Sequence, residues 1–182
     1  HRDPQTGRWT GPFVMSGFNT RIVRRSNALL GWRYGRDFRY REVSDFGAGA
    51  LAPVRAAGMA ATLAGIGAGV SFGPTRAVLD RILPKPGEGP SADVRAAGRF
   101  AMLIEAETGS GAAYRTWVRA DLDPSFEGTA LMLGESALAL ALDGESLPQA
   151  AGVLTPATGI GRVLVDRLVA QGMTLAAERI GG

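Results

Sequence analysis

Residues 99–142 have the sequence RFAMLIEAETGSGAAYRTWVRADLDPSFEGTALMLGESALALAL, and this stretch decides the fold class. Within it, residues 100–107 and 113–120 alternate between two kinds of side chain, which is typical of strands with one buried face. The sequence TGSG at residues 108–111 favours a tight turn between them. The stretch therefore predicts an antiparallel hairpin.

A helix is expected directly after the hairpin. Asp123 and Pro124 are typical of an N-cap and a first helical position, and Glu127 suits the positive end of the helix dipole. Residues 129–142 are apolar on nearly every side, which favours a helix buried by more than one neighbour. For Glu135 we weigh a buried carboxylate with a raised pKa against an exposed helix edge, and we favour the edge.

The rest of the chain mixes helices and strands. Helices are expected at residues 19–31, 51–69 and 75–83, and after residues 155–162 up to Gly172. Strands are expected at residues 13–17, 38–45, 153–154 and 173–180. This order predicts a two-layer α+β fold, with a mixed, largely antiparallel sheet and helices packed mainly on one face.

The 182 residues are sufficient for one domain with a sizeable core. The turn-rich residues 1–12 predict a disordered or linking start, and residues 13–182 are expected to form a single domain. The proline- and glycine-rich sequence PKPGEGPS at residues 84–91 predicts a rigid loop, and loops beside a sheet often carry sites.

Composition excludes several kinds of chemistry. The chain has no cysteine, so disulfides, thiolate nucleophiles and cysteine-ligated zinc are excluded, and a cytoplasmic location is expected. Its one histidine is His1, which leaves no internal imidazole for a Ser-His-Asp triad or a His-based zinc site. No metal site is therefore expected.

Positive charge is concentrated near the beginning of the chain. Residues 1–41 contain nine arginines and two aspartates, a balance of +7, whereas the remainder has a balance of −4. Arg21, Arg24 and Arg25 follow the spacing that places side chains on one helix face. We favour a solvated or subunit-facing charged surface, with a small-anion site next, and we regard nucleic-acid binding as the weakest alternative.

Two glycine-containing segments resemble ligand-binding motifs. The sequence GIGAG at residues 65–69 lacks the third glycine of a dinucleotide fingerprint, because Val70 follows it, so helix packing is favoured over a cofactor site. The surrounding residues 56–73 are uncharged but consist mostly of alanine and glycine, which favours a packed helix over a transmembrane span. Thr155 and Thr158 favour helix capping over anion binding. Asp121 and Asp123 favour a strand end and a helix cap over metal binding.

Several segments together resemble one family. They are residues 19–35, NTRIVRRSNALLGWRYG; 38–43, FRYREV; 83–91, LPKPGEGPS; 119–141, RADLDPSFEGTALMLGESALALA; and 152–161, GVLTPATGIG. In order and spacing they resemble the C-terminal half of saccharopine dehydrogenase-like oxidoreductases, especially the trans-acting enoyl reductase branch. The resemblance extends from about residue 12 to residue 175.

The resemblance implies that two domains of the parent protein have separate roles. It implies that an N-terminal Rossmann domain, absent from this chain, binds NAD(P), and that this chain is the substrate-binding and dimerisation domain, inactive alone. Enoyl reductases of this branch reduce carbon–carbon double bonds on acyl or polyketide chains. The alternative is a free-standing ligand-binding or oligomerisation module without enzymatic activity.

The resemblance supplies no catalytic residue and no cofactor-binding residue. It does imply a set of substrate-pocket candidates from two of the matching segments. They are Asn19, Arg21, Arg24, Arg25, Ser26, Asn27, Gly87, Glu88, Gly89 and Ser91.

Overall fold

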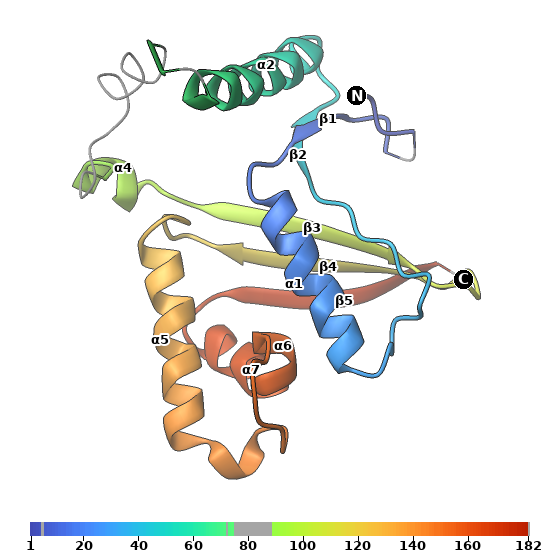
Figure 1. The fold of residues 1–182 in the computed structure, drawn as a ribbon, viewed down its shortest axis with the longest axis vertical. Coiled ribbons are helices and arrows are strands. Elements are labelled where there is room, and N and C mark those ends of the chain that lie inside the picture. The colour runs from blue at the N-terminus through green and yellow to red at the C-terminus, as the bar shows by residue number, and fades with distance from the viewer. Residues whose placement is uncertain (5, 72, 75–88, 182) are drawn as a thin grey trace. The chain divides into compact units, whose positions relative to one another are not determined.

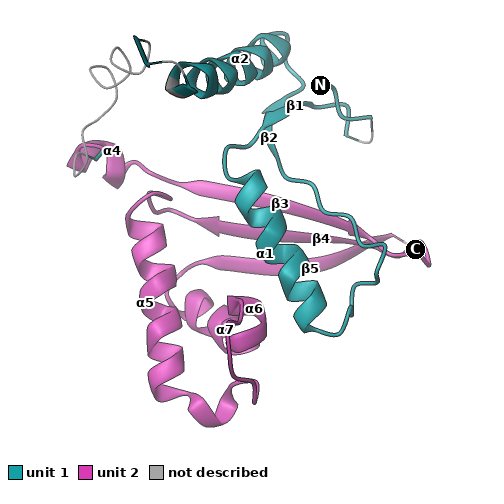
Figure 2. Cartoon of the chain, viewed as in Figure 1, with its two compact units in different colours: residues 1–89 teal, residues 90–182 magenta. Residues whose placement is uncertain are grey.

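A computed structural model describes the chain except for residues 5, 72, 75–88 and 182. It divides into two compact units, His1–Gly89 and Pro90–Gly182 (Figure 2), and each is described by itself. The helix expected at residues 75–83 and most of the loop at residues 84–91 lie outside the described residues. The expectation of a single domain stays a prediction.

Unit 1 combines a two-stranded antiparallel sheet with two helices (Figure 1). Its elements are β1 (Trp9–Pro12), α1 (Ser16–Leu29), β2 (Val43–Gly47) and α2 (Ala52–Ser71). Strand β1 begins within the turn-rich start of the chain and pairs with β2, where Thr10 lies opposite Asp45. The start of the chain therefore contributes to the sheet of this unit.

Two strand predictions in unit 1 need correction. The strand expected at residues 13–17 is absent, because the chain turns there and Ser16 already begins α1. The strand expected at residues 38–45 begins only at Val43, since the preceding residues run back along α1 (Figure 1). We call residues 34–42 the returning segment. Hydrogen bonds to the side chains of Asn19 and Asn27 hold it along α1, so its alternating residues do not pair with another strand.

Helix α2 packs on this sheet through small side chains. Ala52 and Ala56 are buried, and α2 contacts both β1 and β2. The approach is close at Gly11, where an added Cβ would lie 2.9 Å from a ring carbon of Phe46 and 3.4 Å from the Ala56 carbonyl oxygen. The expectation of a packed interior helix is wrong for most of α2, because residues 57–62 and 64–68 are exposed and an added Cβ at Gly65 or Gly67 would meet no atom within 4 Å. Among the described helices, α2 included, none has the length and apolar character needed to span a bilayer.

Unit 2 contains a three-stranded antiparallel sheet in the order β3-β4-β5 (Figure 1). Its elements are α4 (Ala92–Ala96), β3 (Phe100–Glu107), β4 (Ala113–Ala120), α5 (Glu127–Leu142), the short 3-10 helix η1 (Gly144–Ser146), α6 (Pro156–Gly159), α7 (Arg162–Ala170) and β5 (Thr174–Gly181). The hairpin and the final edge strand are confirmed. The strand expected at residues 153–154 is wrong, since these residues form a loop before α6.

The core of unit 2 lies between one face of this sheet and the helices. Ala120, Leu168 and Met173 are buried at its centre. Partly buried side chains complete it: Phe100, Val118, Leu122, Leu131, Met132, Leu164 and Leu175. The chain thus has an α+β fold, as expected, although its described strands form two small antiparallel sheets rather than one mixed sheet.

Helix α5 is less enclosed than its composition suggests. The Asp123 carboxylate accepts a hydrogen bond from the Phe126 N–H at 2.7 Å, but α5 begins only at Glu127 with Phe126 as its N-cap, so the expectation of Asp123 as the N-cap and Pro124 as the first helical residue is wrong. Only one stripe of α5 is buried, since α7 packs against a single side of it. Leu133 and Leu140 on the opposite side are 70% and 60% exposed. The expectation that several neighbours enclose this helix is wrong within the described part of unit 2.

Candidate functional site

Asn27, one of the pocket candidates, organises the turn that follows α1. Its side chain is 2% exposed, its Nδ2 donates to the Gly35 carbonyl at 2.8 Å, and its Oδ1 accepts from the Tyr34 N–H at 2.9 Å. The Asn27 carbonyl also accepts from the Trp32 N–H at 2.8 Å. These bonds satisfy buried polar groups within the protein. Asn27 therefore acts on the shape of this turn.

Asn19 holds the far end of the same returning segment. Its Nδ2 lies 2.9 and 3.1 Å from the two Glu42 carboxylate oxygens. Tyr40 also donates a hydrogen bond to Glu42, and burial raises the pKa of Tyr40, with the charge and hydrogen bond of Glu42 adding to the increase. The Tyr40 hydroxyl thus stays protonated at neutral pH and serves as a hydrogen-bond donor.

The three arginines of α1 are exposed and lie beside apolar residues. Phe18, Arg21, Ile22, Arg24 and Arg25 share the outer side of the helix, and we call this surface the arginine face. Phe18 is 65% and Ile22 49% exposed. In the part of the chain that the structure describes, Arg21 and Arg24 have no ion-pair partner. The candidate Ser26 points inward, where its hydroxyl donates to the Ile22 carbonyl at 2.9 Å.

The turn after α1 contains strained backbone. Gly31 and Trp32 both have positive φ, at 66° and 64°, and this conformation is unfavourable for a bulky residue. The Arg36 guanidinium lies 5.0 Å from the centre of the Trp32 ring, and the rings of Tyr34 and Phe38 are 5.4 Å apart. The aromatic residues interleaved with the arginines thus contact partners within the segment.

The remaining pocket candidates come from the loop at residues 84–91. Gly87 and Glu88 lie outside the described residues, and Gly89 is exposed at the end of unit 1. Ser91 belongs to unit 2, where its side chain caps α4 by accepting a hydrogen bond from the Val94 N–H at 3.4 Å. Six candidates thus lie on α1 of unit 1, and Ser91 lies in unit 2.

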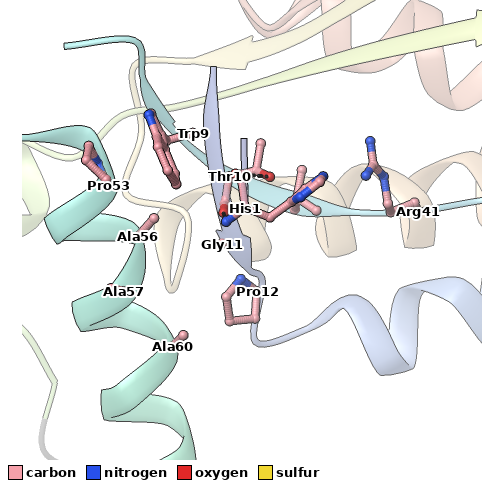
Figure 3. A pocket seen from close by; sticks show the side chains of 11 residues that line it. His1, Trp9, Thr10, Gly11, Pro12, Arg41, Pro53, Ala56, Ala57 and Ala60 are labelled. Carbon is pink, nitrogen blue, oxygen red and sulfur yellow. Dashed lines mark hydrogen bonds between the residues drawn. The ribbon is translucent and has the colours of Figure 1, made fainter. Parts of the chain in front are cut away.

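Unit 1 has a cleft that the sequence did not suggest (Figure 3). It has a volume of about 350 Å³ and lies between β1 and α2, with Arg41 at one side. Its lining is His1, Trp9, Thr10, Gly11, Pro12, Arg41, Val43, Pro53, Ala56, Ala57 and Ala60. An apolar lining with Arg41 at its side suits a ligand that combines a hydrocarbon segment with an anionic or carbonyl group.

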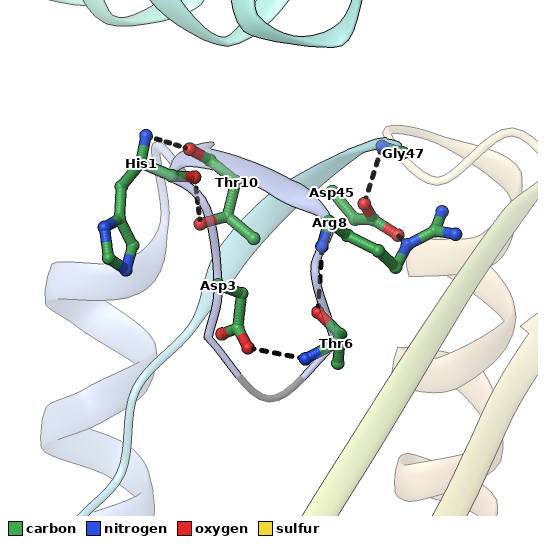
Figure 4. Close-up of polar contacts among 7 residues, drawn as sticks. All are labelled: His1, Asp3, Thr6, Arg8, Thr10, Asp45 and Gly47. Atoms are coloured by element: carbon green, nitrogen blue, oxygen red, sulfur yellow. Dashed lines mark hydrogen bonds and ion pairs between the residues drawn. The ribbon is translucent and has the colours of Figure 1, made fainter. Parts of the chain in front are cut away.

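Polar contacts hold the cleft wall formed by the first residues of the chain (Figure 4). The Thr10 hydroxyl donates to the His1 carbonyl at 3.3 Å, and Arg8 pairs with Asp45 of β2 at 2.7 Å. Asp3 is 6% exposed and pairs with Arg41 at 2.8 Å. Because a buried charge is costly without a partner, this pair fixes Arg41 beside the cleft.

In unit 2, an ionic cluster joins α5 to α7. Glu135 is buried, and its carboxylate lies 2.8 Å from Nε of Arg167, whose Nη1 lies 2.9 Å from Asp143. The hydrogen bond to Glu135 is the main cause that raises the pKa of Arg167. The favoured assignment of Glu135 to an exposed helix edge is therefore wrong. The carboxylate is buried and holds two helices together.

Two other sequence hypotheses concern ligands in unit 2 and metals. Thr155 and Thr158 form a capping box at the start of α6, with the Thr155 N–H donating to the Thr158 hydroxyl at 3.0 Å, which confirms helix capping. Within the described residues, no three side chains of His, Cys, Asp or Glu lie together as metal ligands would.

Comparison with known proteins gives relatives of one kind. The chain is 43% identical over 177 residues to a putative trans-acting enoyl reductase of Mycobacterium tuberculosis, a match that covers 96% of this chain and 42% of that protein. It is equally similar to a trans-acting enoyl reductase of Mycobacterium bovis, and 44% identical to one of Mycobacterium ulcerans. No family model and no solved structure matches the chain. Almost all of this chain thus corresponds to less than half of proteins named trans-acting enoyl reductases.

Proposed function

We propose that this chain is the substrate-binding part of an NAD(P)-dependent enoyl reductase that acts on acyl or polyketide chains in the cytoplasm. The observation that carries the proposal is the 43% identity over 96% of the chain to proteins named trans-acting enoyl reductases. Since the chain spans 42% of those relatives, reduction needs a further part of the protein. That part is a saccharopine dehydrogenase-like Rossmann domain, which binds the nicotinamide.

The glycine run of unit 1 supports this division. Residues 65–69 lie inside α2, and a dinucleotide fingerprint instead requires a turn directly after a strand. The backbone N–H groups in the middle of a helix are bonded within the helix, so they are not directed at a pyrophosphate. Residues 65–69 therefore do not form a phosphate-binding turn, and in this proposal the cofactor belongs to the other part of the protein.

The cleft between β1 and α2 is the best-supported place for an acyl chain. Its walls are mostly the apolar parts of Trp9, Pro12, Ala56 and Ala60, and Arg41 lies beside them. Hydrocarbon segments gain free energy from burial against such walls. Arg41 is then positioned to interact with the carbonyl oxygen or an anionic group of a thioester substrate.

The experiment compares two proteins with one substrate and one cofactor. A medium-chain trans-2-enoyl thioester is titrated into this chain by calorimetry, and NADPH oxidation is followed at 340 nm with and without the additional Rossmann domain. We expect thioester binding without NADPH oxidation by the chain, and oxidation by the two-part protein. Binding of NADPH by the chain without affinity for the thioester would contradict the proposal.

A matched pair of variants locates the binding surface. Ala57→Phe places a large side chain at the cleft, whereas Gly58→Phe changes the next residue of α2, where an added Cβ meets no atom within 4 Å. We expect Ala57→Phe to weaken thioester binding by about tenfold, equivalent to ~1.4 kcal/mol, and Gly58→Phe to change it little. Equal affinities of the two variants would place the acyl chain elsewhere.

The proposed enzyme is a homodimer, and α5 offers a surface for it. Ala130, Leu133, Ala137 and Leu140 are exposed and spaced three and four residues apart, the pattern of a seam between two helices. Leu133 and Leu140 expose 70% and 60% of their surface. Two copies of α5 side by side would remove this apolar stripe from water.

A further inference from the structure

We propose that the arginine face of α1 docks a protein partner whose surface combines carboxylates with apolar side chains. This inference goes beyond the proposed reductase function, because it concerns a surface separate from the cleft. The evidence is the charge and exposure of Arg21 and Arg24, which have no ion-pair partner among the described residues of unit 1, together with the exposed apolar residues beside them.

Charge complementarity identifies the partner as acidic. Residues 16–40 contain six arginines and one acidic residue, Asp37, a balance of +5. Three of the four carboxylates in the described part of unit 1 are engaged elsewhere, since Glu42 accepts from Asn19, Asp3 pairs with Arg41, and Asp45 pairs with Arg8; the fourth, Asp37, forms no ion pair with Arg21 or Arg24 there. Their positions do not neutralise Arg21 or Arg24. An acidic surface would gain both steering and contact energy from these exposed guanidinium groups.

The apolar residues favour a protein over a nucleic acid. Phe18 and Ile22 lie one helical turn apart beside Arg21 and Arg25, and both are about half exposed or more. Aromatic residues and arginine are enriched in protein interfaces, where apolar side chains fill the centre and charges the rim. A phosphate backbone has no group that benefits from a buried Phe18 or Ile22. The surface therefore has the composition of a protein interface.

The aromatic residues after α1 point to the same choice. Base stacking needs available ring faces. Arg36 lies over the Trp32 ring, and Tyr34 contacts Phe38, so each of these rings already has a partner in the same segment. These contacts keep the turn in one shape at the end of the arginine face.

The inner side of α1 keeps the arginine face directed outward. Asn19 and Asn27 bond to the returning segment at Glu42 and Gly35, so that side of the helix is occupied. Arg25 has a contact of its own, and the proposal rests on Arg21 and Arg24. Within unit 1, the helix is thus fixed so that both arginines and Phe18 lie on the side away from the returning segment.

The test measures binding of a fluorescein-labelled amphipathic helical peptide built from Glu and Leu to the full chain. Fluorescence anisotropy is recorded at about 50 mM and about 500 mM NaCl, since screening weakens exposed charge pairs. Arg21→Glu/Arg24→Glu is compared with Arg55→Glu/Arg99→Glu, which makes the same charge change at exposed arginines elsewhere. Phe18→Ser tests the apolar contribution without changing charge. Circular dichroism verifies that each variant is folded.

We expect peptide binding at low salt that falls about tenfold or more in Arg21→Glu/Arg24→Glu and by less than about threefold in Arg55→Glu/Arg99→Glu. Phe18→Ser should weaken it severalfold. No binding at low salt, or equal losses in the two charge-matched variants, would overturn the proposal. So would tighter binding to an oligothymidine of equal charge or to phosphatidylglycerol vesicles. None of these readouts depends on reductase activity, so the proposed function and this inference fail separately.

Discussion

At the scale of single residues, Tyr40 shows how one neighbour changes an ionisation. Burial raises its pKa from 10.0, and Glu42 raises it further by charge and hydrogen bonding. Glu42→Gln removes the charge, so we expect the pKa of Tyr40 to fall towards 10.0 in an ultraviolet titration. The phenol contributes stability that is present below the unfolded pKa and lost as pH rises through the folded pKa. In the variant that loss should therefore be smaller and complete at lower pH, and an unchanged titration would contradict the assignment.

Asn27 offers a residue-scale test of the turn after α1. Asn27→Ala leaves the Tyr34 N–H and the Gly35 carbonyl without their side-chain partner in a nearly buried position. We expect a loss of about 1–3 kcal/mol in the free energy of unfolding, measured by urea denaturation. Ser44→Ala, which removes one exposed bond of 3.3 Å to the Pro12 carbonyl, is the control and should change stability by less than about 0.5 kcal/mol. Equal losses of unfolding free energy in the two variants would show that the bonds of Asn27 contribute no more than one exposed hydrogen bond.

The candidate site was only partly accessible from the sequence at this scale. Spacing alone placed Arg21, Arg24 and Arg25 on one exposed side, because helix geometry is local. The partners of Asn19 and Asn27 depend on the path of the returning segment, which no spacing rule gives. The cleft was missed because its walls, β1 and the alanines of α2, are far apart in sequence and carry no chemical motif. The only sequence signals for the cleft were the WTGP segment at residues 9–12 and, much later in the chain, the small residues of α2.

At the scale of elements, local order explains which predictions succeeded. The hairpin of β3 and β4 was predictable because its strands are joined by a short turn and alternate strictly. The pairing of β1 with β2 was not, because its partners lie more than thirty residues apart and an alternating segment between them runs along α1 instead. Helix α5 was recognised from its composition. Its one-sided burial depends on how many neighbours pack against it, and composition does not report that number.

Two glycines of unit 2 test how closely its elements approach. At Gly98, an added Cβ would lie 2.5 Å from the Asp123 Cα, whereas at Gly134 in α5 it meets no atom within 4 Å. We expect Gly98→Ala to destabilise the protein by about 1–3 kcal/mol through overpacking. Gly134→Ala should stabilise it by about 0.5–1 kcal/mol, since alanine is the better helix former. Thermal unfolding followed by circular dichroism measures both, and a stabilising Gly98→Ala would refute the close contact.

The ionic cluster between α5 and α7 tests the packing of those helices. Arg167→Met leaves the buried Glu135 carboxylate without its partner, whereas Asp143→Asn keeps that pair and removes a more exposed charge. We expect a clearly larger fall in melting temperature for Arg167→Met than for Asp143→Asn. Glu135→Leu/Arg167→Met should recover much of the loss, because the unpaired buried charge is then gone. Similar melting temperatures for Arg167→Met and Asp143→Asn would show that Glu135 is not the residue that needs compensation.

At the scale of the whole molecule, the similarity to the enoyl reductases extends across both compact units, since it covers 96% of the chain. The two units therefore belong to one inherited segment. Unit 2 closes its core against only one face of its sheet and one stripe of α5, and the outer stripe of α5 stays apolar. Selection for a soluble monomer does not explain a row of exposed leucines at helical spacing. This apolar stripe is the basis of the homodimer that we propose.

The dimer is the prediction that follows at this scale. We expect the chain to sediment at twice its mass of 19.0 kDa, and Leu133→Glu/Leu140→Glu to sediment at 19.0 kDa, because paired carboxylates in an apolar seam repel and lose hydration. Val94→Glu/Val153→Glu is the matched control, since it places the same two charges at residues 60% and 80% exposed outside α5. It should remain dimeric. A wild-type monomer would remove the dimer, and a dimer that survives Leu133→Glu/Leu140→Glu would move its interface away from α5.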